Sequence, residues 1–280
     1  MKNAKVDISG LTARQRLQRV LSEIGPEAKK SLGQHFLVND LVISRMLEKT
    51  KSLDFQHIIE IGPGPGALTE LLLQLDKSYL AIELDHRICN YWRNLGIEVI
   101  EEDALKVNWS PLYRGPKNLL ISNLPYQISA SIVIDRSLDK EGPDHMILMF
   151  QKEVAQRVRG EPRGEHYGIL SVIAQSFWEI EMVSEAGPGD FDPPPKVASR
   201  VLYFKKRATP LAAEDFLFLV KQSFQQRRKL LRKNLGVYLQ KVKKTEADLE
   251  SWLTAQGLSP MARAEELSVA QFQKLFQELR

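Results

Sequence analysis

The chain has 280 residues, of which 43% are hydrophobic and 26% are charged. These proportions are close to the average for globular proteins, so they exclude disorder as the dominant state and leave enough apolar residues for a sizeable core. No apolar run approaches the roughly 18 residues that a membrane span needs, and residues 1–25 lack the apolar segment of a signal peptide. The single cysteine, Cys89, cannot form an internal disulfide, which suits a reducing compartment without establishing one. We expect a cytoplasmic protein, and a membrane is not among its expected partners.

The net charge of +4 is unevenly distributed along the chain. Residues 1–30 carry a net charge of +4, and residues 221–244 contain nine basic residues and no acidic ones, so the remaining residues are acidic overall. A concentrated basic block indicates a polyanionic partner. Charge alone leaves three interpretations of this block open: a nucleic-acid surface, an anionic membrane surface and a solvated helix face.

The predicted elements begin after a basic extension that is weakly amphipathic around residues 11–21 and ends at Gly25-Pro26. From residue 31 to about residue 204, short apolar runs alternate with segments of helical periodicity. Strands are predicted at 57–61, 79–82, 98–100, 118–121 and 146–150, and helices at 67–75, 86–94 and 129–138. This alternation is typical of an α/β fold with a mainly parallel sheet and helices on both faces.

The second part of the chain changes character. Two alternating runs at 178–183 and 197–204 flank a loop rich in proline and glycine, and they predict an antiparallel pair at the sheet edge. After Pro210 the composition shifts to helix formers, with helices predicted at 216–224, 229–235, 247–255 and 269–279. We therefore expect three parts: a basic N-terminal extension at 1–28, an α/β domain at 29–207 and a small all-α domain at 208–280.

A glycine-rich segment, EIGPGPG at 60–66, follows a predicted strand and opens a predicted helix. Glycine lets the backbone turn tightly and approach a ligand closely. By itself this segment is a weak signal, because it also fits a dinucleotide-binding pattern. In that pattern it reads Gly62-x-Gly64-x-x-Ala67, with Glu83 as the ribose acid 21 residues after Gly62.

Polar residues at four successive strand ends narrow the interpretation. Glu83, Asp103 and Asn123 are spaced 20 residues apart, and Glu60 and Gly62 end the strand before them. The carboxyl ends of parallel strands meet at one edge of a sheet, where ligands bind. There Glu83 can accept hydrogen bonds from a ribose diol and Asp103 one from an adenine amine. Because the glycine-rich segment has no Lys or Arg, a ligand with a ribose and a base but no phosphate fits best.

The segment Asn123-Leu124-Pro125-Tyr126 lies at the fourth strand end and predicts the chemistry. An adenine amine is a poor nucleophile because its lone pair is delocalised into the ring. The side-chain carbonyl of Asn123 and a backbone carbonyl of the Leu124–Pro125 segment can accept both amine hydrogens and free the lone pair for attack on a sulfonium methyl. Pro125 stiffens the local backbone, and Tyr126 offers a ring on which a flipped base can stack. The five histidines show no ligand spacing, so we expect no metal.

With these motifs in place, the chain resembles the KsgA-type small-subunit ribosomal RNA adenine dimethyltransferases. The resemblance runs from about residue 29 to residue 280. It rests on nine segments in chain order: KSLGQHFL (30–37), EIGPGPGALT (60–69), IELD (82–85), DA (103–104), NLPY (123–126), FQKEVAQR (150–157), YGILSV (167–172), FDPPPKVAS (191–199) and FQQRRKLLRKNL (224–235).

The resemblance implies a Rossmann-like class I methyltransferase with a mainly parallel seven-stranded sheet in its methyltransferase domain, and a small all-α C-terminal domain that binds ribosomal RNA. It implies S-adenosyl-L-methionine as cofactor and two methyl transfers to each of two adjacent adenosines in the 3′-terminal hairpin of small-subunit rRNA. The implied partner is this rRNA, in a pre-assembled small ribosomal subunit, and we expect the enzyme to be a monomer that acts in ribosome biogenesis.

The resemblance also implies roles for individual residues. The cofactor-binding residues would be His35, Leu37, Gly62, Gly64, Glu83 at the ribose, Asp103 at the adenine amine, and Asn123 between cofactor and target. Phe191 would be a second stacking ring opposite Tyr126. Two features depart from the family pattern: His35 stands where the family usually has Asn, and the extension at 1–28 is longer than expected.

The basic block is interpreted as the RNA contact. It places Arg227, Arg228, Lys229, Arg232 and Lys233 on one predicted helix, with residues 228 and 232, and 229 and 233, on shared faces. Three alternatives stay open: a nicotinamide-dependent dehydrogenase, in which the NLPY segment has no role; a non-catalytic ribosome assembly factor on the same fold; and a large-subunit rRNA adenine dimethyltransferase. The proline-rich 191–199 segment and the full C-terminal domain favour the small-subunit enzyme.

Overall fold

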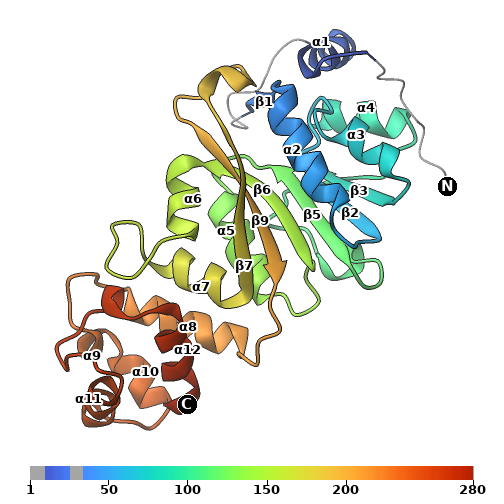
Figure 1. Ribbon diagram of the computed structural model, residues 1–280. Coiled ribbons are helices and arrows are strands. Elements are labelled where there is room, and N and C mark those ends of the chain that lie inside the picture. The colour runs from blue at the N-terminus through green and yellow to red at the C-terminus, as the bar shows by residue number, and fades with distance from the viewer. Residues whose placement is uncertain (1–9, 26–33, 280) are drawn as a thin grey trace. The chain divides into compact units, whose positions relative to one another are not determined.

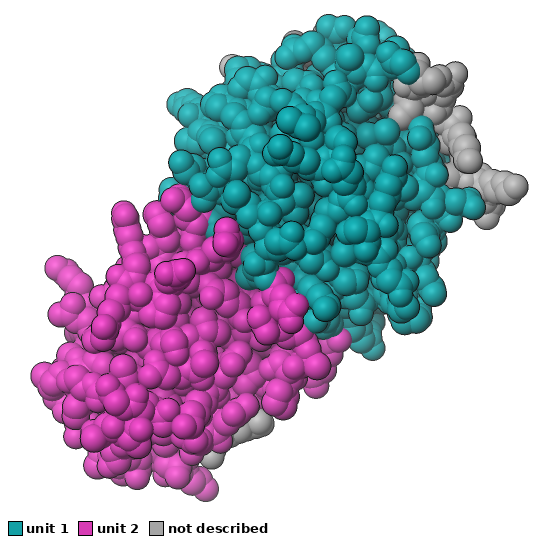
Figure 2. All heavy atoms as spheres, viewed as in Figure 1, with its two compact units in different colours: residues 1–132, 141–155, 180–206 teal, residues 133–140, 156–179, 207–280 magenta. Residues whose placement is uncertain are grey.

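The computed structural model describes residues 10–25 and 34–279 (Figure 1). The chain divides into two compact units, shown in different colours in Figure 2. Unit 1 comprises residues 1–132, 141–155 and 180–206, and unit 2 comprises residues 133–140, 156–179 and 207–280. The predicted boundary between an extension and the α/β domain, at residue 28, lies outside the described residues.

A seven-stranded sheet with the order β4-β3-β2-β5-β6-β9-β7 is the framework of the fold. The five strands from β4 to β6 run parallel to their neighbours, and β9 is antiparallel to β6. This confirms the predicted mainly parallel sheet. The strands are β2 (His57–Ile61), β3 (Ser78–Glu83), β4 (Val99–Glu101), β5 (Asn118–Asn123), β6 (His145–Gln151), β7 (Trp178–Ala186) and β9 (Ser199–Lys206).

The central strands are short, mostly apolar segments that the sheet buries on both faces. Every residue of β2 is buried, and Leu119, Leu120 and Ile121 of β5 have no exposed surface. Such runs are typical of parallel strands covered by helices. The structure assigns β2 the predicted bounds and extends β5 by two residues, to Asn123.

Two helices of this part begin at polar caps. Asp85 accepts a hydrogen bond from the amide of Arg87 at the start of α4, and Asn39 accepts from the amides of Leu41 and Val42 at the start of α2. The helices α4 (His86–Asn94) and α5 (Ser129–Leu138) have the predicted bounds. The remaining elements of this part are α2 (Asp40–Lys51), α3 (Thr69–Leu72), η2 (Leu73–Leu75), η3 (Ser110–Leu112) and α6 (Lys152–Val158).

Two segments outside the main sheet complete unit 1. The described part of the extension forms the helix α1 (Ala13–Ile24), which begins with a capping box between Thr12 and Gln15. The short strands β1 (Phe36–Leu37) and β8 (Phe191–Asp192) pair antiparallel, with Leu37 opposite Phe191. The turn η4 (Pro188–Asp190) precedes β8.

Unit 2 is helical and is held by aromatic contacts. The ring of Phe216 lies edge-on to Phe177 and Phe276, with centroids 6.2 and 5.5 Å apart, and Phe224 stacks on Phe272 at 5.7 Å. Its helices are α7 (Ile169–Phe177), α8 (Ala213–Ser223), α9 (Leu231–Asn234), α10 (Gly236–Lys241), α11 (Glu246–Ala255), η5 (Ala264–Glu266) and α12 (Val269–Glu278). None of the helices in the described parts of the chain is long and apolar enough to cross a membrane.

The prediction of a helix through the basic block was wrong. Residues 224–228 form turns, residues 229–230 are irregular, and only Leu231–Asn234 is helical there. In this turn the side-chain amide of Asn234 donates to the backbone carbonyls of Ser223 at 2.7 Å and Gln226 at 3.1 Å. These bonds stabilise the non-helical backbone between α8 and α9.

Candidate functional site

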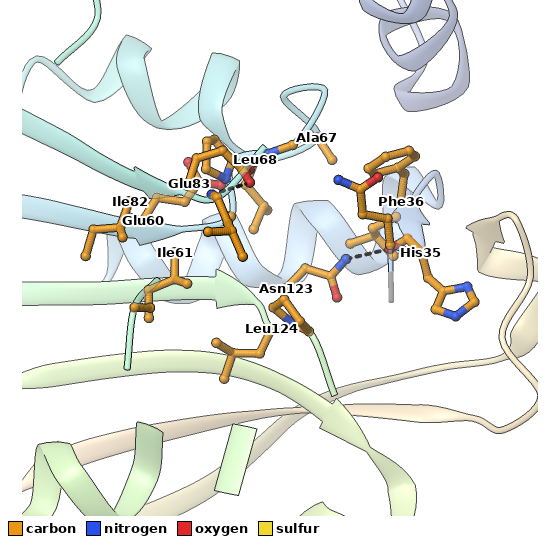
Figure 3. Close-up of a pocket in the computed structure, with 18 of the residues that line it drawn as sticks. His35, Phe36, Glu60, Ile61, Ala67, Leu68, Ile82, Glu83, Asn123 and Leu124 are labelled. Carbon is orange, nitrogen blue, oxygen red and sulfur yellow. Dashed lines mark hydrogen bonds between the residues drawn. The ribbon is translucent and has the colours of Figure 1, made fainter. Parts of the chain in front are cut away.

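A pocket in unit 1 lies at the carboxyl ends of the parallel strands. The ends of β2, β3 and β5 line it, together with the glycine loop at 62–66 and the segment at 34–37 (Figure 3). The structure brings ten sequence-predicted residues together here: His35, Leu37, Gly62, Gly64, Glu83, Asp103, Asn123, Leu124, Pro125 and Tyr126. Residues that are up to 91 positions apart in the chain thus share one cavity because parallel strands end at one edge.

The glycine loop requires glycine for two different reasons. Gly62 has a φ of 66°, and a Cβ placed on it would meet no atom within 4 Å, so its backbone faces open space at the pocket. Gly66 has a φ of 90°, and a Cβ there would lie 2.9 Å from the ring of Trp92. The same ring donates a hydrogen bond of 2.9 Å to the carbonyl of Gly64. The loop therefore packs closely against Trp92 at Gly66, whereas its backbone at Gly62 is accessible from the pocket.

The buried side chain of Glu60, at the end of β2, stabilises the segment around this loop. Glu60 accepts hydrogen bonds from the hydroxyl of Tyr79 at 2.5 Å and from the hydroxyl of Thr69 at 2.9 Å. Burial raises the pKa of Glu60 to about 7, although both hydroxyls lower it. Thr69 begins α3, directly after the loop, so Glu60 joins β2, β3 and α3. This network was not predicted, because only the fold brings Tyr79 to Glu60.

Glu83 presents a buried carboxylate at the end of β3. Its Oε1 accepts from the amides of Leu84 at 2.7 Å and Asp85 at 2.9 Å, and its Oε2 accepts from Gly64 at 3.4 Å. Burial raises the pKa of Glu83, and the three backbone donors oppose that shift. The side chain is therefore held in one orientation, 8% exposed, with its charged edge at the pocket.

Asn123 and His35 are joined across the pocket. The side-chain amide nitrogen of Asn123 donates a hydrogen bond of 3.0 Å to the backbone carbonyl of His35 (Figure 3). The imidazole of His35 stacks on Tyr126, with centroids 5.8 Å apart and planes 25° apart, and Nδ1 lies 2.8 Å from the carbonyl oxygen of Pro193. The contact between His35 and Asn123 is therefore made by the backbone of His35, so it does not depend on His replacing the usual Asn at this position.

Of the last two predicted residues, one lies at the pocket and the other does not. Asp103 lines the pocket, and its Oδ1 accepts from the amide of Leu105 at 2.9 Å, so the turn after β4 orients the carboxylate. Phe191 is 2% exposed, belongs to the core of unit 1 and does not line the pocket. Phe191 is thus placed in the core of unit 1, and its stacking role opposite Tyr126 stays a prediction.

Several pocket residues were missed by the sequence analysis. Ala13 and Leu17 come from α1, and Phe36 lies with its ring 3.5 Å from where a Cβ of Gly64 would be. The sequence carried a signal for α1 in the Thr12-x-x-Gln15 capping box and in the apolar spacing that follows it. Among the described residues, no group of His, Cys, Asp and Glu side chains could hold a metal ion.

The predicted RNA-binding residues lie in unit 2, and most of them are paired with acids. Arg227 pairs with Glu265 at 2.8 Å, Lys233 with Glu246 at 3.0 Å, and Arg232 with Glu250. Arg228 and Lys229 are exposed, and within the described chain their side chains have no carboxylate partner. The predicted basic face is thus partly neutralised by helices α11 and η5, and its exposed charge is concentrated in the turn at 228–229.

Comparison of the sequence with known proteins identifies its family. A family model described as "Ribosomal RNA adenine dimethylase" matches residues 25–280. A similar protein, the ribosomal RNA small subunit methyltransferase A of Bdellovibrio bacteriovorus, is 53% identical over 265 residues, which cover 94% of this chain and 97% of that protein.

Two solved structures are also similar to this chain. A dimethyladenosine transferase from Plasmodium falciparum superposes with a TM-score of 0.71 at 23% identity, covering 86% of this chain and 96% of that one. The 23S rRNA methyltransferase ErmE superposes with a TM-score of 0.62 at 25% identity, covering 87% of this chain and 98% of that one. The first likeness is one of fold, and it confirms the predicted methyltransferase fold class.

Proposed function

Because the chain belongs to the ribosomal RNA adenine dimethylase family, we propose that it dimethylates the exocyclic amines of adenosines in small-subunit rRNA, with S-adenosylmethionine as methyl donor. The finer part of the proposal is the target: two adjacent adenosines in the 3′-terminal hairpin, within a pre-assembled small ribosomal subunit. We also propose that the enzyme acts as a cytoplasmic monomer. The observation that carries the proposal is the orientation of Asn123 at the pocket.

The residues at the pocket fit the proposed cofactor. Gly62 exposes backbone to open space, which a side chain would fill. Glu83 offers a fixed carboxylate to a ribose diol, and Asp103 offers one to an adenine amine. The glycine loop carries no basic side chain for a pyrophosphate, which argues against the nicotinamide-dependent dehydrogenase. Leu37 and the apolar residues around it suit the uncharged parts of the ligand.

The proposed chemistry depends on how Asn123 is held. Its Nδ2 is committed to the carbonyl of His35, so its Oδ1 is the acceptor that remains for the target amine. A second acceptor is a backbone carbonyl of the Leu124–Pro125 segment, which Pro125 stiffens. Two acceptors on the amine hydrogens move the nitrogen toward tetrahedral geometry and release its lone pair from the ring. S-adenosylmethionine supplies the electrophilic methyl group, on a positively charged sulfur.

Binding of the target base is proposed to use Tyr126. Its ring is half-buried at the pocket, and its hydroxyl lies 2.9 Å from Oγ of Ser199, so the ring is fixed in place. Flipping a base out of its stack costs a few kcal/mol, and one aromatic platform returns about 1–3 kcal/mol. Positioning of the two reactants, worth about 7–11 kcal/mol, supplies most of the rate. No general base is required, because the amine proton becomes acidic after methyl transfer and leaves to water.

Contact with rRNA is proposed for the helical part of the chain at 208–280, with the α/β part at 29–207 as the methyltransferase domain. Arg228 and Lys229 are the strongest candidates for phosphate contacts, because both are exposed and not held by acids within the described chain. Arg227, Arg232 and Lys233 would have to exchange a carboxylate for a phosphate. We therefore propose a smaller electrostatic footprint than the five-residue block predicts.

Two alternatives are less well supported. A large-subunit enzyme is represented among the similar structures by ErmE at 25% identity, whereas the small-subunit relative is 53% identical over nearly its full length. A non-catalytic assembly factor would not need Asn123, Glu83 and Asp103 in one pocket.

Mass spectrometry of rRNA tests the proposal directly. Small ribosomal subunits that lack the modification are incubated with the enzyme and S-adenosylmethionine, and their rRNA is digested and analysed. We expect dimethyladenosine at two adjacent positions of the 3′-terminal hairpin. Methylation of large-subunit rRNA in its place, or RNA binding without methyl transfer, would support one of the two alternatives and refute the proposal.

A further inference from the structure

We infer that helix α1 forms one wall of the cofactor site, with Ala13 and Leu17 facing the cofactor and Arg16 positioning the helix on the glycine loop. The inference rests on the proposed function, because it takes the pocket of unit 1 as the S-adenosylmethionine site. It assigns a role to the part of the N-terminal extension that the structure describes.

The apolar face of α1 matches the pocket. Ala13, Leu17 and Val20 recur at helical spacing, and their exposed fractions are 1, 4 and 0%. Ala13 and Leu17 line the pocket beside Ala67, and Val20 continues the same face into the core of the unit. In contrast, Gln18 on the opposite face is exposed. The helix therefore turns its apolar stripe toward the cavity and its polar stripe toward solvent.

Three hydrogen bonds fix the first half of α1. The backbone amide of Ala13 donates to Oδ1 of Asp40, at the start of α2, at 2.9 Å. The guanidinium of Arg16 donates to the carbonyls of Leu11 at 3.1 Å and Ala67 at 3.4 Å. Since Ala67 directly follows the glycine loop, Arg16 ties α1 to the loop on which the cofactor would lie.

A buried carboxylate of α3 is matched by two cations of α1. Glu70 is 1% exposed, Nε of Arg16 lies 3.6 Å from its Oε2, and Arg19 forms an ion pair with its Oε1. Burial raises the pKa of Glu70, whereas the charges of Arg19 and Arg16 lower it. Removing a cationic partner from a buried charge is strongly destabilising. Docking of α1 is therefore specified by charge as well as by apolar contact.

The same contacts argue against α1 as a basic arm for RNA. Arg16 and Arg19 direct their charges at Glu70, and Arg14 pairs with Asp192 at 3.3 Å. The charges of the three arginines of α1 are thus used within unit 1. A helix that Arg16 holds against the glycine loop is suited to close a ligand site, and cofactor binding and helix docking should stabilise each other by linkage.

The test uses the full chain and S-adenosylhomocysteine as a non-reactive probe in calorimetry. The variant Leu17→Ala removes apolar side-chain atoms that line the pocket, and Arg16→Ala removes the contacts of that arginine side chain with Ala67 and Glu70. Gln18→Ala is the matched control on the exposed face. We expect the dissociation constant to rise about three- to tenfold for the first two variants and to stay unchanged for the control. Arg16→Lys, which keeps the charge toward Glu70, should recover part of the affinity.

Kinetics and hydrogen exchange separate this role from a structural one. With small ribosomal subunits as substrate, Arg16→Ala should raise the KM for S-adenosylmethionine and leave kcat and the KM for the subunit unchanged. In the wild-type protein, S-adenosylhomocysteine should slow amide exchange within α1. Absence of that protection would overturn the inference, whatever the stability of the variants.

The other outcomes are distinguishable from failure of the proposed function. Glu83→Gln serves as the comparison variant in the same calorimetry. If Glu83→Gln weakens binding but Leu17→Ala and Arg16→Ala do not, the pocket is the cofactor site and α1 is not its wall. If none of the three variants weakens binding, the site assignment itself is wrong. If Arg16→Ala raises only the KM for the subunit, α1 contacts RNA and the inference is refuted.

Discussion

The side chain of Asn123 and the backbone of His35 are hydrogen-bonded at 3.0 Å, although 88 residues separate them in the chain. A backbone carbonyl can only accept a hydrogen bond, so the amide nitrogen of Asn123 must face His35. The carbonyl oxygen of the same side chain is thereby directed away from His35, at the end of β5. The segment before β1 thus orients the group that the proposed chemistry requires.

Replacing Asn123 tests this orientation. Asn123→Ala should lower kcat for methyl transfer about 100- to 1000-fold, as expected when one preorganised polar contact to the reacting group is lost. Affinity for S-adenosylhomocysteine should change little, because Glu83 and Asp103 are untouched. Asn123→Asp should be equally slow, since a carboxylate cannot donate to the carbonyl of His35. Radiolabelled methyl transfer to unmodified small subunits measures the rate, and near-normal turnover of either variant would contradict the assignment.

His35 should contribute its backbone to the cofactor side and its ring to the target side. His35→Asn and His35→Ala keep the carbonyl that binds Asn123, so S-adenosylhomocysteine affinity should stay within about threefold of the wild-type value. The ring that stacks on Tyr126 is lost. We expect kcat/KM for the ribosomal subunit to fall about two- to tenfold, the worth of one aromatic pair. Calorimetry and steady-state kinetics check the two halves, and a large loss of cofactor affinity would show that the ring itself binds the cofactor.

Glu60 should make stability depend on pH. Its pKa is raised from 4.5 to about 7 in the folded protein, chiefly by burial. The folded state therefore holds a proton that the unfolded state releases, so this stabilisation is complete below pH 4.5 and is lost as pH rises through 7. Glu60→Gln retains acceptors for Tyr79 and Thr69 without the charge. Between pH 5 and pH 8 the wild type should lose about 2–3 kcal/mol of unfolding free energy that the variant does not lose. The stability difference between variant and wild type should change by that amount in favour of the variant.

Urea unfolding of the cofactor-free protein at both pH values measures this gain. Thr254→Ala, a surface variant in α11, controls for general effects of pH on stability. A wild-type protein and a Glu60→Gln variant with parallel pH profiles would show that Glu60 titrates normally.

Much of the sheet and of the pocket follows from local patterns. The strand at 57–61 and the helices at 86–94 and 129–138 were predicted with the bounds that the structure has, because each combines an uninterrupted period with a polar cap or a turn at its ends. The pocket positions of Glu83, Asp103 and Asn123 follow from the strand–helix repeat alone. The order of strands and helices thus predicts that these three side chains lie together, which no single motif predicts.

The remaining features depend on long-range contacts. α1 was predicted only as a weak amphipathic segment, because its Arg16 reads as a surface residue until Glu70 is placed beside it. The acidic partners of the basic block were not predicted, because nothing in its own sequence indicates that Glu265 lies against Arg227. Phe191 was predicted as a second stacking ring opposite Tyr126, and its burial opposite Leu37 was not foreseen. In each case the partner is distant in sequence, so periodicity and composition carry no information about it.

The turn at 228–229 should account for most of the salt dependence of RNA binding. Arg228→Ala with Lys229→Ala removes two exposed cations that no described carboxylate holds. Each lost phosphate contact lowers the slope of log K against log salt by about one, so we expect a reduction of about two. Arg232→Ala with Lys233→Ala is the matched control, since Glu250 and Glu246 already neutralise these side chains. For this control, the slope of log K against log salt should differ from the wild-type slope by less than about one.

Binding of unmodified small subunits at several salt concentrations measures both slopes. The two double variants carry the same net charge, so any difference between them reports on which charges meet phosphate and not on the total charge. If Arg232 and Lys233 had the larger effect, they would exchange their carboxylate partners for phosphates on binding, and the rRNA contact would then centre on α9. Equal slopes for both variants and the wild type would exclude these four side chains from the rRNA interface.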